Sequence, residues 1–187
     1  LFGRDEELSY AELLLGMVQQ RGGGYASAIA GEAGVGKTHL AHEILNRARR
    51  HGYAVLAGFA RAGGSAPYAP VVEALRTHAA GLPDETLHAA LANARGAAAL
   101  MPEVAARLRL DPTPATGDNL VRRDLVHAVA ALAADRPVAL LLDDLHEADA
   151  ATLKRPETAA RELLAAIADA LPQPRTPAVS RSPLFAF

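Results

Sequence analysis

The 187-residue sequence predicts an α/β fold with a parallel central sheet. Segments with apolar residues at helical spacing alternate with short apolar runs, which is typical of parallel-sheet α/β proteins. One run, at residues 138–142, is continuously apolar, as is typical of a strand buried on both faces of a sheet. A glycine-rich loop at residues 31–37 stands between a strand candidate and a helix candidate. A chain of this length can bury a core without disulfides or metals.

The N-terminal segment predicts a helix at residues 5–20, because Leu8, Leu15 and other apolar residues fall on one face. Asp5 can cap the start of this helix, and three consecutive glycines end it. The small-residue run YASAIA at residues 25–30 then predicts a short buried strand, which leads into the glycine loop.

Residues 37–51, behind the loop, again carry apolar side chains at helical spacing. Gly52 stands where a glycine commonly follows a helix. The run YAVLAGFA at residues 53–60 predicts a second strand. Pro70 opens a further helix that extends to about residue 80.

The next part of the chain is less regular, because prolines divide it. Short helical pieces are predicted near residues 84–94 and 102–109, followed by a longer helix at residues 118–134 that Asp118 can cap. The apolar run at 138–142 comes next and predicts the last clear strand.

We expect residues 1–171 to form one domain, in which residues 81–134 are a helical insertion or connection. The proline-rich residues 172–187 are expected to be an irregular tail. Because the sequence begins at Leu1 and not at Met, we expect it to be a piece of a longer protein, with its sheet incomplete at the C-terminal side.

Composition excludes several classes of function. There is no cysteine, so a disulfide framework, a thiolate zinc site and a cysteine nucleophile are excluded. The net charge of −2 argues against a protein that coats nucleic acid. No apolar window is long enough to predict a membrane span, and no leader segment is recognisable, so we expect a cytoplasmic protein.

The strongest motif is a phosphate-binding loop of the form G-x-x-x-x-G-K-[ST], the Walker A pattern. Glycines let backbone N–H groups turn toward phosphate oxygens, and the following helix directs its dipole at the same anion. Lys37 is expected to reach the β- and γ-phosphates of ATP, and the Thr38 hydroxyl to bind Mg²⁺. The alternative is an ordinary glycine-rich turn with a solvated lysine. The loop residues are Gly31, Glu32, Ala33, Gly34, Val35, Gly36, Lys37 and Thr38.

The apolar run at residues 138–142 ends in two carboxylates, as a Walker B strand does. Because neighbouring strand residues point to opposite faces, the two carboxylates should differ in role. We assign Asp143 to Mg²⁺ and Asp144 to polarising the attacking water. The alternative is a strand that continues into a solvated acidic turn.

Four segments in this order resemble the AAA-type ATPase domain of STAND P-loop NTPases, as found in large LuxR-type transcriptional regulators. They are LFGRDEEL at 1–8, GEAGVGKTHLAHEI at 31–44, SAPYAPVVEALR at 65–76 and LLLDDLHEADAATL at 140–153. The resemblance implies a P-loop NTPase three-layer fold and a switch between ATP and ADP forms. A downstream sensor domain and an effector domain would read that switch, without direct nucleic acid contact by this segment.

The resemblance also implies that Phe2, Gly3 and Arg4 lie at the adenine end of the site. An apolar residue that packs against the first helical turn is the alternative for Phe2. The sequence departs from the family where Glu147 replaces a usual tryptophan, and where Pro156 interrupts a helix. The expected sensor arginine has only a weak candidate, Arg181. We therefore expect a truncated module that can self-associate.

These inferences predict an ATP- and Mg²⁺-binding module that hydrolyses ATP slowly and acts as a signalling switch. The alternative is a non-catalytic nucleotide-dependent interaction module, or a degraded fragment of a cyclase- or kinase-linked signalling protein. His39 and His42 are spaced as a possible ligand pair, but no third ligand is spaced to join them. We expect both to be exposed helix positions.

Overall fold

The structure is a computed structural model that describes residues 3–22, 24–27, 29–60, 68–111, 118–143 and 165–167. Within these ranges helices and strands follow one another along the chain. They are α1 (Asp5–Arg21), α2 (Lys37–Arg50), β1 (Ala54–Phe59), α3 (Ala69–Ala79), α4 (Asp84–Leu91), α5 (Arg95–Ala99), α6 (Pro102–Leu108), α7 (Asp118–Leu132) and β2 (Val138–Asp143).

The two described strands pair in parallel, from Ala54 opposite Val138 to Phe59 opposite Asp143. Backbone bonds extend the ladder at both ends, because Ala54 N donates to Pro137 O at 2.8 Å and Ala60 N donates to Asp143 O at 3.0 Å. A parallel pair needs a crossover connection, and here α3 to α7 provide it. The expected mixed α/β arrangement with a parallel sheet is therefore confirmed, and the described sheet is small, with two strands.

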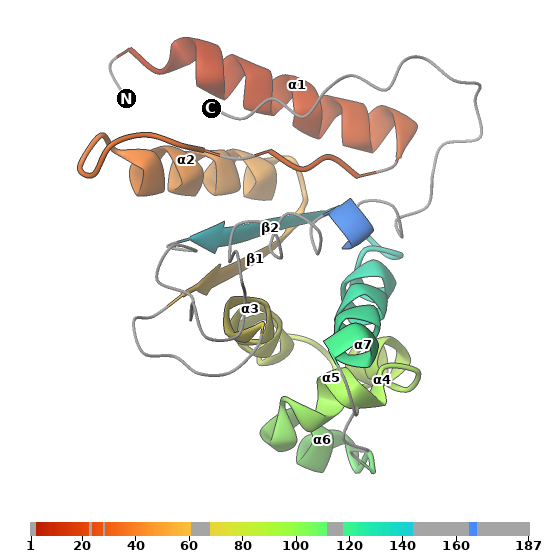
Figure 1. Ribbon diagram of the computed structural model, residues 1–187. Helices are drawn as coiled ribbons and strands as arrows, with labels where there is room; N and C mark the ends of the chain where they lie inside the picture. The colour runs from red at the N-terminus through yellow and green to blue at the C-terminus, as the bar shows by residue number, and fades with distance from the viewer. Residues whose placement is uncertain are drawn as a thin grey trace.

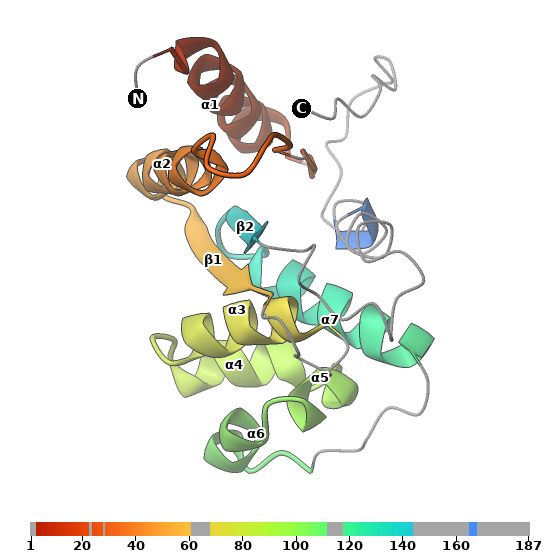
Figure 2. The same ribbon diagram turned by 60° about the vertical axis from the view of Figure 1, so that its left-hand side comes forward.

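Helices cover both faces of this sheet (Figures 1 and 2). Alternation along the strands explains the arrangement, because successive side chains point to opposite faces. Ala54 and Leu56 belong to the large core cluster that includes buried residues of α3 and α7. Val55 and Ala139 pack instead against the smaller cluster of Leu15, Ala48 and Tyr53, on the side of α1 and α2.

Close packing of α3 on β1 depends on Gly58. A Cβ added to this residue would lie 1.7 Å from the carbonyl oxygen of Pro70, a backbone atom that cannot move aside. The first turn of α3 therefore lies directly on the last residues of β1, and only glycine fits at the contact.

Below the sheet in Figure 1, α4 and α5 pack against α7, and α6 packs against α4 and α5. The buried carboxylate of Asp124 connects α7 to α5, because it accepts a hydrogen bond from Gly96 N of α5 at 2.8 Å. Arg123 donates to the other carboxylate oxygen, which satisfies a charge that would be costly to bury alone. The sequence predicted α7 and short helical pieces near α4 and α6, but it did not predict α5.

The predicted strand at residues 25–30 is wrong for the part of that segment which the structure describes. These residues form no strand, and Tyr25 and Ile29 are 47% and 36% exposed. The segment passes beside α2 and stays outside the sheet (Figure 1). Its small side chains bury too little apolar area to hold a strand without a paired neighbour.

Two further expectations change in detail. β2 is partly exposed along its whole length, whereas the sequence predicted burial on both faces. The reason is that β1 is its one strand partner among the described residues. Arg4 and not Asp5 occupies the N-cap position of α1, where its side chain makes no capping hydrogen bond, and Asp5 is the first residue of the helix. The acidic first turn still suits the positive end of the helix dipole.

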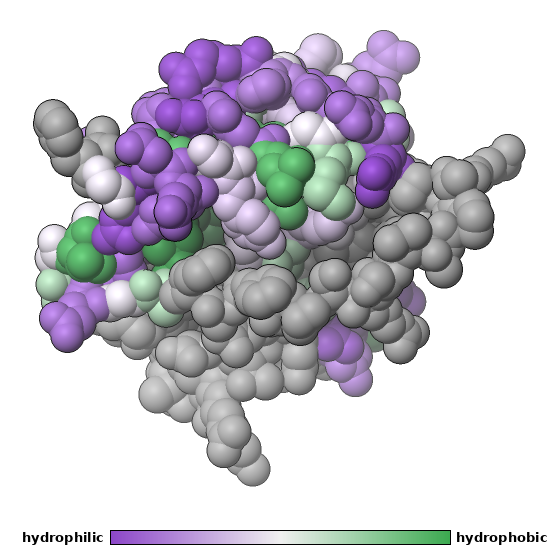
Figure 3. Space-filling view, turned by 90° about the horizontal axis from the view of Figure 1, so that it is seen from above, coloured by the Kyte–Doolittle hydropathy of each residue, from purple (hydrophilic) through white to green (hydrophobic). Residues whose placement is uncertain are grey.

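The surface above α1 is mostly hydrophilic, with small hydrophobic areas (Figure 3). Leu13 is the most exposed large apolar side chain of this helix, at 59%. None of the helices in the described ranges is long and apolar enough to cross a membrane.

Candidate functional site

The glycine loop forms a tight turn in front of α2. Gly34 and Gly36 adopt left-handed backbone conformations, with φ of +79° and +91°. Residues with a Cβ rarely adopt such φ angles, which explains glycine at both positions. Val35 N donates to Glu32 O at 3.4 Å across the turn. The sequence G-x-x-x-x-G-K-T thus has the backbone geometry that its glycines require.

Lys37 is the first residue of α2, and its side chain folds back across the loop. Its Nζ donates to Gly31 O at 3.1 Å and to Glu32 O at 3.0 Å. An ammonium group has three donors and is held here by neutral carbonyl oxygens. An anion placed beside the loop would offer a stronger, charge-assisted partner to the same ammonium.

An open hollow of about 740 Å³ lies beside the loop and the first turns of α2. Among the described residues, no side chain makes a capping hydrogen bond to the N-terminus of α2. The positive end of the dipole of this 14-residue helix lies there. The hollow therefore combines backbone N–H groups, a helix N-terminus and an ammonium group. Its described lining consists of Ala33, Gly34, Gly36, Lys37, Thr38, His39 and His42.

Asp143 lies at the carboxyl end of β2, on the sheet face that α2 covers. Phe59 is its register partner, and the Phe59 ring lies 6.3 Å from the ring of His42 on α2. Strand alternation puts the Asp143 side chain on the same face as Phe59. Its Oδ2 atom is buried. Asp143 is not among the described residues that line the hollow. His42, which does line it, connects the hollow to this strand end.

Arg4 reaches the loop from the start of α1. Its Nη2 donates to Val35 O at 3.0 Å, while its Nη1 forms an ion pair with Glu7 at 2.8 Å. The hydrogen bond from Arg4 lowers the pKa of Glu7 below its usual value of 4.5. The preceding Gly3 has a left-handed φ of +75°.

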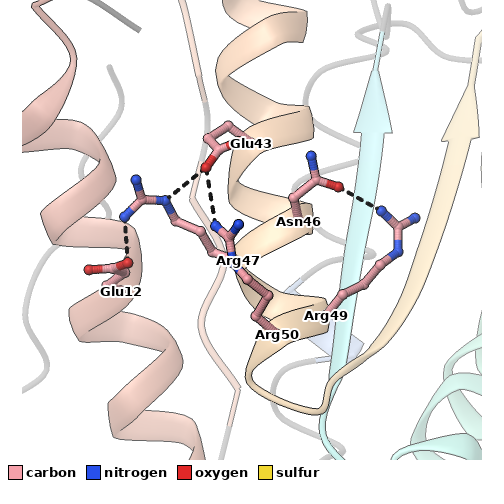
Figure 4. A network of polar contacts seen from close by, with 6 residues as sticks. All are labelled: Glu12, Glu43, Asn46, Arg47, Arg49 and Arg50. Carbon is pink, nitrogen blue, oxygen red and sulfur yellow. Dashed lines mark hydrogen bonds and ion pairs between the residues drawn. The ribbon is translucent and has the colours of Figure 1, made fainter.

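Polar contacts fasten α1 to α2 behind the site (Figure 4). Arg47 of α2 forms ion pairs with Glu12 of α1 and with Glu43, which also accepts a hydrogen bond from Arg50 at 3.2 Å. Burial raises the pKa of Glu43, but the hydrogen bonds from Arg47 and Arg50 outweigh it and lower the pKa overall. The cluster thus supports the helix whose first turn borders the hollow.

The structure brings the loop residues 31–38 together, with Arg4 beside them and Asp143 on the facing side of the sheet. Phe2 and Asp144 lie outside the described residues, as do Glu147, Pro156 and Arg181.

His39 and His42 are the lining residues to which the sequence assigned no role. Both are exposed, as expected, and both border the hollow. The helical repeat is the signal that could have found His42, because residues 38 and 42 are one turn apart on the helix that follows the loop.

Comparison with known proteins gives one family match. The family model described as AAA ATPase domain matches residues 1–179. No curated protein and no solved structure matches the chain.

Proposed function

The chain belongs to the AAA ATPase domain family, and from that premise we propose that it binds ATP with Mg²⁺ at residues 31–38 and acts as a nucleotide-dependent switch. The observation that carries the proposal is the arrangement of loop, lysine and hollow. Two left-handed glycines shape the loop, Lys37 lies across it, and the hollow opens at the N-terminus of α2. Backbone N–H groups at such a place suit a polyphosphate.

The donor set also suits Mg²⁺, which prefers oxygen ligands and keeps several of its waters. Thr38 supplies a hydroxyl in the first turn of α2, and Asp143 supplies a carboxylate on the sheet face that α2 covers. The buried Oδ2 of Asp143 supports this assignment, because a buried carboxylate is favourable beside a cation. In this proposal Thr38 and Asp143 hold the ion, which would neutralise phosphate charge during hydrolysis.

Lys37 is assigned to the phosphates. On nucleotide binding its ammonium exchanges the carbonyls of Gly31 and Glu32 for phosphate oxygens, and it remains there as charge develops on the transferred group. Asp144 follows Asp143 directly in sequence and is proposed to orient the attacking water. Arg4 bonds to the loop at Val35 O, and Phe2 and Gly3 are proposed for the adenine end.

Slow turnover is part of the proposal. Arginine side chains that stabilise the transition state of phosphoryl transfer contribute about 10³-fold or more in rate. The described lining of the hollow contains no arginine and no carboxylate. The same observation favours the second candidate, a module that binds nucleotide without hydrolysing it.

The proposed role in a signalling regulator rests on the four segments that resemble STAND NTPases of LuxR-type regulators. We propose that sensor and effector domains of a larger cytoplasmic regulator read the nucleotide state of this module. ATP and ADP are its proposed ligands.

Calorimetric titration of the purified chain with Mg·ATP tests binding. Lys37→Ala should weaken binding severely, because it removes the one ammonium among the described residues at the loop. Arg49→Ala is the matched control, since Arg49 lies at the other end of α2 and donates to Asn46. A folded wild-type chain that binds no nucleotide would refute the proposal.

Phosphate release then separates the two candidates. A switch that hydrolyses slowly should release phosphate at a rate above the buffer background, but slower than about one turnover per second. Release that equals the background in a chain that binds Mg·ATP would favour the non-catalytic module.

A further inference from the structure

The guanidinium of Arg4 joins the start of α1 to the glycine loop. One arm donates to the Val35 carbonyl at 3.0 Å, and the other pairs with Glu7 at 2.8 Å. The Arg4 side chain is 29% exposed, so the fork is partly shielded from solvent. Residues 31–35 of the loop are exposed, and besides this contact the bonds from Lys37 and from Val35 N hold their conformation.

The contact sets the direction of one loop peptide. In a planar trans peptide the C=O and the following N–H point in opposite directions. Because the Val35 carbonyl faces Arg4, the N–H of Gly36 points away from Arg4. Gly36 lines the hollow. Its own carbonyl accepts the hydrogen bond of Leu40 N at 3.0 Å, so the next peptide is already fixed by α2.

We propose that Arg4 is a positioning residue for polyphosphate binding: it holds the Val35 carbonyl and thereby keeps the Gly36 N–H directed into the hollow. The proposal rests on the proposed function of the loop. It differs from the sequence-based expectation for Arg4, which put this residue at the adenine end of the site. A residue that acts through the loop backbone affects any polyphosphate, with or without a base.

Helix α1 is anchored well enough to serve as the support for this contact. Tyr53 OH donates to Leu15 O at 2.6 Å, and Gln19 donates to His51 O near the C-terminal end of α1. The ion pair between Glu12 and Arg47 fixes its middle (Figure 4). At the N-terminal end of α1, Arg4 makes the contact to the loop.

The test compares Mg·ATP with inorganic tripolyphosphate in the presence of Mg²⁺, since tripolyphosphate has neither base nor ribose. Affinities are measured by calorimetry for the wild type, Arg4→Gln, Arg4→Lys and Glu7→Gln, with Arg49→Gln as the matched control. We expect Arg4→Gln to weaken both ligands by the same factor, about tenfold or more, as for loss of a charge-assisted contact. Arg4→Lys should recover part of the loss, because an ammonium can still donate to the carbonyl.

A second readout follows the peptide itself. Tripolyphosphate should shift the amide resonance of Gly36 in the wild type and in Arg49→Gln, and shift it less at saturation in Arg4→Gln. Glu7→Gln retains Arg4 and frees one arm of its fork, so it should give a smaller loss of affinity for both ligands. This variant also keeps the proposal testable if Arg4→Gln does not fold.

Three outcomes would overturn the inference. If Arg4→Gln weakens ATP and leaves tripolyphosphate unchanged, Arg4 contacts the base or the ribose. If it changes neither affinity, Arg4 does not position the loop. Both results leave the proposed function intact, because the wild type still binds. A wild-type chain that binds neither ligand refutes the proposed function, and this inference with it.

Discussion

The left-handed backbone conformation of Gly36 helps to set the shape of the loop. Its φ of +91° lies in the left-handed region, and an added Cβ would meet no atom within 4 Å. A substitution there is therefore strained by the backbone alone. A substitution at Gly34 would likewise be strained by its φ of +79° and not by a steric contact, because an added Cβ there also meets no atom within 4 Å.

Gly36→Ala should lower the free energy of unfolding by roughly 1–2 kcal/mol, the cost of a left-handed conformation for a residue with a Cβ. Gly16→Ala is the matched control, because Gly16 lies inside α1 with open space around its Cβ position. That change should stabilise the protein by about 0.5–1 kcal/mol. Urea unfolding measures both, and equal effects of the two variants would contradict the role given to Gly36.

Asp143 and Asp144 provide a second prediction at the scale of single residues. Asp143→Asn should impair Mg²⁺-dependent nucleotide binding, because it removes a carboxylate proposed to hold the ion. Asp144→Asn should preserve binding and reduce hydrolysis. Titrations with and without Mg²⁺, together with phosphate release, measure the two effects. Equal loss of binding in both variants would show that the assignment of roles is wrong.

Tyr53 joins three elements, since it precedes β1, lies against α2 and donates to a carbonyl of α1. Its side chain belongs to the cluster with Leu15 and Ala48, and its hydroxyl bonds to Leu15 O at 2.6 Å. Burial raises the pKa of Tyr53 from 10 to about 12. The phenol is therefore protonated in the folded protein at pH values where the unfolded chain loses the proton.

This pKa predicts a pH dependence at the scale of the elements. A raised pKa in the folded state gives stability that is present below pH 10 and is lost as the pH rises toward about 12. Tyr53→Phe should remove that part of the decline. It should also lower stability at neutral pH by about 1 kcal/mol, because the hydrogen bond to α1 is lost. Unfolding measured from pH 8 to pH 11 in both proteins tests this, and parallel curves would refute it.

Nucleotide binding should stabilise the whole molecule. The loop, Arg4 and the α1–α2 contacts belong to connected elements, so a ligand held at the loop stabilises the folded state as a unit. Mg·ATP at about 100 times its Kd should raise the free energy of unfolding by roughly 2.7 kcal/mol. Urea unfolding with and without nucleotide measures the change. Lys37→Ala should show none at the same concentration, and a gain as large as that of the wild type would count against the role of Lys37.

The fold could be predicted where the sequence pattern is local and strong. The apolar spacing behind Lys37 and behind Asp118 predicted α2 and α7, and β1 and β2 follow from short apolar runs. The segment at 25–30 could not be settled in this way. Its small residues are compatible with a strand or a loop, and the choice depends on whether a neighbouring strand is present to pair with it.

The candidate site was likewise predicted from the sequence only in part. The motif at residues 31–38 determined which residues shape the loop, because only glycine suits its left-handed positions and only Lys37 supplies an ammonium there. It gave no reason to place Arg4 on the Val35 carbonyl, since that contact joins residues 31 positions apart. The lining of the hollow by His42 likewise depends on how α2 lies against β1.

The sequence by itself thus determined the order of the elements, the loop and the residue types that can bind a phosphate and Mg²⁺. Each of these depends on local spacing and on the backbone preferences of glycine and proline. Only the tertiary structure decided that α1 supports the loop through Arg4, that Asp143 lies on the face covered by α2, and that residues 24–27 and 29–30 stay outside the described sheet. The physical reason is that these contacts join distant parts of the chain, so packing and strand pairing determine them and local pattern does not.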